Sequence, residues 1–73
     1  MIKHQINPKK LLHSKWTAKT PKIKEKHFIV IKVTYDEFDQ VECCEIEAVL
    51  TKRVASIDWR SLKNANDWIQ GWQ

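Results

Sequence analysis

Residues 27–59 read HFIVIKVTYDEFDQVECCEIEAVLTKRVASIDW and contain most of the β-branched and apolar residues of the chain. Apolar and polar side chains alternate along three parts of this stretch, a period of two that is typical of strands with one buried face. Residues 36–40 and 51–52 are polar and separate these parts. The stretch therefore predicts an antiparallel meander. Its three strands are expected over residues 27–35, 41–50 and 53–59.

The alternation also predicts which side chains face the interior. One face of the first strand is apolar throughout, while the other face is apolar at Phe28 and Val30 and then becomes polar. In the second strand, Glu45 and Glu47 are expected on the solvent side. The side chains predicted to face inward are Ile29, Ile31, Val33 and Tyr35, then Cys44, Ile46, Ala48 and Leu50, then Ala55, Ile57 and Trp59.

The flanking segments are expected to extend the sheet and to cover it. Residues 1–8 are predicted to form a flexible arm, and Pro8 favours one turn of helix directly after it. Trp16 and Ala18 alternate with polar neighbours, which predicts a short strand over residues 14–20. The last segment, 60–73, has apolar residues at spacings of three and four, which predicts a short C-terminal helix.

The fold class that this pattern predicts is mainly β with a short C-terminal helix. We expect a single domain over residues 1–73, whose sheet of about four strands occupies residues 14–59 as a small antiparallel meander or a half-open SH3-like barrel. A chain of 73 residues has only a thin core, so each large side chain matters. The core is expected to consist of Leu11, Phe28, Ile29, Ile31, Val33, Ile46, Ala48, Leu50, Ile57, Trp59 and Trp68.

The charges of the chain are divided unevenly along its length. Residues 1–32 carry nine Lys and one acid, Glu25, for a net charge of +8, whereas residues 33–73 carry four basic and eight acidic residues, for a net charge of −4. Such asymmetry favours either a polyanionic partner for the basic half or internal pairing of its lysines with acids on the sheet.

Nucleic acid is the polyanion that this composition fits best. Lysines neutralise phosphates, and an exposed indole stacks on an unpaired base of RNA or single-stranded DNA. The arginines that dominate base readout are absent from the basic half, which weakens the hypothesis. The candidate contact residues are Lys9, Lys10, Lys15, Trp16, Lys19, Lys22, Lys24, Lys26 and Trp72.

Protein binding is the alternative function. A domain of this size has little room to bury four Trp, and an indole left exposed, at Trp72 or Trp16, would anchor a partner or a second copy as a weak dimer. The predicted strand at residues 14–20 would offer an edge for strand addition. Salt separates the two hypotheses, because phosphate contacts weaken steeply with ionic strength.

The sequence predicts neither catalysis nor a bound metal or cofactor. Gly71 is the only glycine, so a glycine-rich phosphate loop is absent, and the histidines are scattered. The adjacent Cys43 and Cys44 would point to opposite faces of a strand, so we expect free thiols. Free thiols, together with the lack of a signal-like or membrane-spanning apolar run, favour the cytoplasm.

Four segments together resemble a known family. They are NPKKLLHSKWTA at residues 7–18, KEKHF at 24–28, EAVLTKR at 47–53 and IDWRSLKNANDWIQGW at 57–72. They are similar to a family of small Trp-rich bacterial proteins known only as a domain of unknown function (DUF2389-like). The resemblance covers nearly the whole chain and includes all four Trp. It implies a compact bacterial cytoplasmic protein, and it implies no activity, cofactor or site residue.

Overall fold

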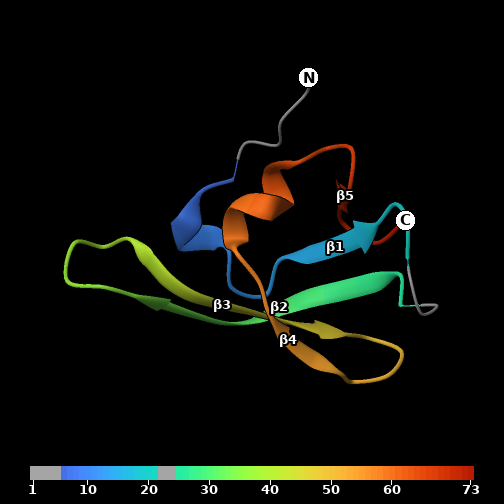
Figure 1. The fold of residues 1–73 in the computed structure, drawn as a ribbon, viewed down its shortest axis with the longest axis horizontal. Helices are drawn as coiled ribbons and strands as arrows, with labels where there is room; N and C mark the ends of the chain where they lie inside the picture. Colours follow the sequence, from blue (N-terminus) through green and yellow to red (C-terminus); the bar gives the residue numbers. More distant parts are fainter. Residues whose placement is uncertain (1–5, 22–24) are drawn as a thin grey trace.

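The computed structural model describes residues 6–21 and 25–73, and these residues form one open antiparallel sheet (Figure 1). The strand order is β4-β3-β2-β1-β5, and the two helical segments are short 3-10 turns. The elements are η1 (Pro8–Lys10), β1 (Lys15–Ala18), β2 (His27–Tyr35), β3 (Val41–Ala48), β4 (Val54–Ser56), η2 (Trp59–Lys63) and β5 (Trp68–Gln70). The prediction of a mainly β fold is confirmed, and the arrangement fits a small half-open barrel.

The predicted meander is confirmed, because β2, β3 and β4 are neighbours in both sequence and sheet. Phe28 lies opposite Ala48, and Val30 lies opposite Ile46, in the longest strand pair of the sheet. The register then shifts between Val30 and Lys32, where β2 holds one extra residue. Such a bulge moves the following side chains of the strand to the other face.

The bulge explains why the inward face predicted for β2 is wrong at its start. Phe28 and Val30 are the buried residues, whereas Ile29 and Ile31 are only partly covered. Beyond the bulge Val33 packs against the core, as predicted, whereas Tyr35, which was also predicted to face inward, is 40% exposed. The pattern of apolar residues on both faces of this strand therefore marks a change of face at Ile31.

The interior alternation predicted for β3 is confirmed at Cys44, Ile46 and Ala48, which are all buried. It fails at Leu50, which is 73% exposed. The strand ends at Ala48, where the chain turns and the Lys52 amide donates to the Ala48 carbonyl over 2.8 Å. The turn is completed by a left-handed Lys52 with φ of 63°.

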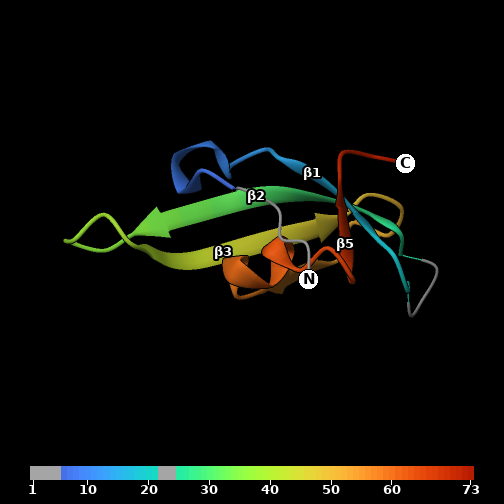
Figure 2. The same cartoon turned by 90° about the horizontal axis from the view of Figure 1, so that it is seen from above.

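The predicted C-terminal helix over residues 60–73 is wrong. Its first part is the 3-10 turn η2, and its second part is the strand β5, which pairs with β1. Two amides, those of Asp67 and Trp68, donate to the Asn64 carbonyl and turn the chain between the two elements. Figures 1 and 2 show η2 on the path from β4 back to β5 at the opposite edge of the sheet.

The N-terminal segment begins as predicted, with a turn in which Pro8 is the first helical residue. Asn7 caps this turn, since its Oδ1 accepts from the Lys9 amide over 3.0 Å. The predicted flexible arm falls largely outside the described residues, and its residue Ile6 packs against the core. The turn directs Leu11 into the interior, where it is fully buried.

The core lies on one face of the sheet and is closed by both 3-10 turns. Trp16 and Leu62 are central to it, with 1% and 0% exposure, although neither residue was predicted to belong to the core. Its buried apolar members are Leu11, Trp16, Phe28, Val30, Cys44, Ile46, Ala48 and Leu62.

Replacing Leu62 with alanine is expected to destabilise the protein by about 2–5 kcal/mol, because it opens a cavity in a core that has few residues to spare. The matched control is Leu50→Ala, which removes the same atoms from an exposed turn and should change the free energy of unfolding by less than about 0.5 kcal/mol. Urea unfolding of both variants measures the difference, and equal effects would contradict the assigned core.

Candidate nucleic-acid interface

The lysines of the predicted contact surface are distributed over three places in the fold. Lys9 and Lys10 lie in η1, Lys15 begins β1, and Lys19 and Lys26 lie at the two ends of the β1–β2 connection. All five are exposed. The predicted contacts Lys22 and Lys24 lie outside the described residues.

Trp16 does not belong to this surface, contrary to the sequence analysis. Its side chain is 1% exposed, and its Nε1 donates to the Ser14 hydroxyl over 2.9 Å. An indole enclosed in this way has no face on which a base can stack. The predicted strand with an indole on one face is present, but this face packs against the core and not against solvent.

Trp72 is the one indole of the four that is exposed, at 43%. The Lys15 ammonium lies 4.7 Å from the centre of its ring, and the His27 ring centre lies at 6.1 Å. The Trp72 Nε1 donates to the Phe28 carbonyl over 3.0 Å, which fixes the ring against β2. Lys15, His27 and Trp72 are named here the Trp72 cluster, which unites two of the predicted contact residues.

The last three residues reach this position because the chain turns at Gly71. Its φ of 81° lies in the left-handed region, which glycine adopts without strain. Thr17 then holds the turn, since its hydroxyl donates to the Gly71 carbonyl over 2.7 Å and accepts from the Gln73 amide over 3.0 Å. The His27 Nε2 lies 2.8 Å from the Gln73 carbonyl oxygen. The C-terminus therefore covers β1 and buries Thr17.

A second group of cations, which was not predicted from the sequence, lies beside Trp59. The Lys63 ammonium lies 4.6 Å from the ring centre, and the Arg60 guanidinium carbon lies 5.8 Å from it. Both cations belong to the same 3-10 turn as the indole. The spacing of Trp59, Arg60 and Lys63 along a single turn was the signal available in the sequence.

Glu25, the single acid of the basic half, is 5% exposed and pairs with Arg53. The Arg53 Nε donates to both carboxylate oxygens over 3.0 Å, and Nη2 adds a further bond to Oε1. The Thr51 hydroxyl donates to Oε2. Hydrogen bonds from Arg53 and Thr51 lower the pKa of Glu25, and the same pairing raises the pKa of Arg53. The pair joins the β1–β2 connection to the β3–β4 turn.

The thiols and potential metal ligands form no further site in the described ranges. Cys43 and Cys44 are free, and burial raises the pKa of Cys44 to about 11, so its thiol is protonated at neutral pH. Across residues 6–21 and 25–73, no group of three or more His, Cys, Asp or Glu could hold a metal ion. No helix in the same ranges is long and apolar enough to cross a membrane.

The predicted edge strand at residues 14–20 is not an edge. Within the described sheet, β1 pairs with β2 on one side and with β5 on the other, so its backbone groups are engaged. The edges are β4 and β5, of three residues each. Such short edges limit unwanted pairing with other strands.

The fold and its surfaces define a small β-sheet protein whose indoles serve both the core and the exposed surface. The chain belongs to the tryptophan-rich protein family DUF2389, which matches residues 14–73. The family that the four sequence segments indicated is therefore confirmed. No curated protein and no solved structure matches the chain.

The Glu25 pair predicts a specific pH dependence of stability. Because the folded pKa of Glu25 lies below the ordinary value of 4.5, the pair stabilises the fold above pH 4.5, and this contribution is lost as the pH falls through the folded pKa. Glu25→Gln should therefore lower the urea midpoint near neutral pH, and the difference from the wild type should shrink in acid.

The exposed Glu37 provides the control, since Glu37→Gln removes the same charge without breaking the pair. Its urea midpoint should follow the wild-type curve across the pH series. A Glu25→Gln difference that persists unchanged well below pH 4.5 would contradict the assigned ion pair.

Proposed function

We propose that this protein is a non-catalytic module that binds single-stranded DNA or RNA through the Trp72 cluster and the exposed lysines of η1, β1 and the β1–β2 connection in its N-terminal half. The observation that carries the proposal is the exposed indole of Trp72 beside the Lys15 ammonium. Base-aromatic stacking and nearby cations are the two elements of sequence-tolerant binding to single strands. Trp72, which follows the turn at Gly71, supplies the aromatic ring, and Lys15 of β1 supplies the cation.

The distribution of charge supports an anionic partner. The exposed lysines at η1, β1 and the β1–β2 connection belong to the segment with a net charge of +8. The only acid in that segment is neutralised by Arg53. The basic half therefore presents lysines to solvent without a compensating carboxylate of its own, and such a surface attracts phosphates by releasing their counterions.

Protein binding is the second candidate, and exposed apolar side chains of the β3–β4 region favour it. Leu50 is 73% exposed and Val54, on the edge strand β4, is 47% exposed. With Trp72 they would supply apolar contacts to a partner protein or to a second copy in a weak dimer. Such an interface should respond little to salt compared with phosphate contacts.

The compartment that we propose is the bacterial cytoplasm. Cys43 and Cys44 are free thiols, and they are adjacent in one strand. Unpaired cysteines of this kind are favoured where thiols are kept reduced. A location in the cytoplasm would also expose the basic surface to RNA.

Titration with a mixed single-stranded RNA, followed by tryptophan emission, tests the proposed function. Saturable quenching is expected, and the affinity should fall steeply between about 50 mM and about 200 mM salt. Trp72→Leu should weaken binding roughly 5- to 150-fold, which corresponds to about 1–3 kcal/mol of lost stacking. Lys15→Ala should reduce the slope of log K against log salt by about one.

Two controls match these variants. Phe38→Leu removes another exposed aromatic, 73% accessible, from the β2–β3 turn, and Lys32→Ala removes another exposed lysine from β2. Neither should alter the affinity as much as its counterpart. A folded protein that shows no response at low salt would overturn the nucleic-acid proposal, and binding that is insensitive to salt would favour the protein partner.

A further inference from the structure

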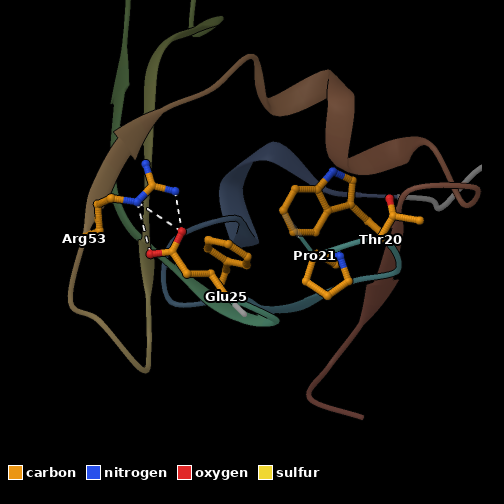
Figure 3. A pocket seen from close by; sticks show the side chains of 7 residues that line it. Thr20, Pro21, Glu25 and Arg53 are labelled. Atoms are coloured by element: carbon orange, nitrogen blue, oxygen red, sulfur yellow. Dashed lines mark hydrogen bonds and ion pairs between the residues drawn. The ribbon is translucent and has the colours of Figure 1, made fainter. Parts of the chain in front are cut away.

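A pocket of about 250 Å³ opens where the end of β1, the β1–β2 connection, β5 and the β3–β4 turn meet. Phe28 and Trp68 form its aromatic wall, with ring centres 5.5 Å apart in an edge-to-face arrangement. Figure 3 shows Thr20 and Pro21 on one side of the pocket and the Glu25–Arg53 pair on the other. We name it the Arg53 pocket. It differs from the Trp72 cluster in every residue.

The guanidinium of Arg53 is held so that one of its edges stays available. Its Nε and Nη2 face the Glu25 carboxylate, and Figure 3 shows the remaining nitrogen directed away from that carboxylate. The Arg53 side chain is 55% exposed, so this outer edge meets solvent. An arginine presents such an edge to phosphate through two parallel hydrogen bonds.

Glu25 does not repel an anion at this place as a free carboxylate would. Both of its oxygens accept hydrogen bonds from Arg53, and one also accepts from Thr51. The buried carboxylate thus fixes the orientation of the guanidinium. The pocket consequently combines an apolar, ring-lined space with one pre-oriented donor group at its rim.

We propose that the Arg53 pocket binds one unpaired nucleotide, with its base against Trp68 and Phe28 and its phosphate on the outer edge of Arg53. This inference rests on the proposed function and adds a specific subsite to it. The volume suits a single ring system, since pockets for drug-sized ligands start at about 300 Å³. Unstacked bases in single strands are commonly bound between aromatic and guanidinium groups.

The charge of the chain selects a nucleotide over other ligands that join a ring to an anionic group. An aromatic carboxylate would satisfy the same wall and the same guanidinium. However, residues 1–32 carry a net charge of +8, and Lys19 and Lys26, which are exposed, directly adjoin the pocket residues Thr20 and Glu25 in the chain. A single-stranded nucleic acid bound at the pocket therefore has its neighbouring phosphates close to the lysines of this basic segment.

Two variants test the subsite by different physical means. Thr20→Tyr places a ring at the pocket from an exposed position and should weaken the binding of an oligouridine strand roughly 5- to 100-fold. Gln40→Tyr adds the same ring at an exposed site outside the pocket and should leave the affinity unchanged. Arg53→Lys retains the charge but loses the two-pronged geometry, so it should lower the affinity without changing the salt slope.

A direct readout is the indole N–H signal of Trp68 in a ¹H–¹⁵N spectrum, assigned with Trp68→Phe. Uridine monophosphate should shift this signal in the wild type and in Gln40→Tyr, and the shift should be lost in Thr20→Tyr. The dispersion of the remaining signals reports whether each variant is folded. A variant that fails to fold leaves the decision to the wild-type titration and to the other variant.

The failure of this inference is distinguishable from the failure of the proposed function. If Trp72→Leu weakens strand binding while Thr20→Tyr and Arg53→Lys bind like the wild type, the subsite is overturned and the proposed function stands. If phenylacetate shifts the Trp68 signal and uridine monophosphate does not, the nucleotide assignment is overturned in favour of an aromatic acid. If the folded wild type binds no strand at low salt, both proposals are overturned.

Discussion

The pairing of β1 on both of its sides is the constraint on which the rest of the structure depends. β1 is only four residues long, yet it joins the meander to β5 and directs Trp16 into the core. The chain must return from β4 to the far edge of the sheet to supply that second partner, and η2 covers the core with Leu62 on the way. The same return brings Trp68 to the Arg53 pocket and Trp72 to the outer surface. The packing of the core and the positions of both candidate sites therefore depend on the same pairing of β1 with β5.

The fold was predictable wherever a strand alternates without interruption. Cys44, Ile46 and Ala48 show this, because one face of β3 is apolar and the other is acidic. The inward face of β2 was not predictable from a regular alternation, because the bulge at Ile31 depends on pairing with β3. The strand β5 was missed for a similar reason. Its apolar residues match a helical period, and only the unpaired edge of β1 determines that they form a strand, a tertiary effect that overrides the local pattern.

The candidate surface was predictable in its charges and less so in its aromatic residues. Lysines are costly to bury, so the exposure of Lys15, Lys19 and Lys26 follows from residue type alone. Which indole stays outside depends on the order of strands. Trp16 lies on the core face of an interior strand, whereas Trp72 follows Gly71 and folds back over the outer face. The pairing of Arg53 with the buried Glu25 could not be predicted from the sequence, because the two residues lie 28 positions apart.

The Glu25–Arg53 pair links the stability of the fold to its proposed function. An isolated buried carboxylate is costly, and Glu25 is tolerated because Arg53 and Thr51 satisfy both of its oxygens. The pair anchors the β1–β2 connection, the most basic segment of the chain, to the β3–β4 turn. The lysines of the β1–β2 connection repel one another, and the negative charge of Glu25 offsets part of this repulsion. Because Glu25 is buried, it occupies almost none of the exposed surface. The exposed lysines then remain available to an external polyanion, which is the property that binding by this face requires.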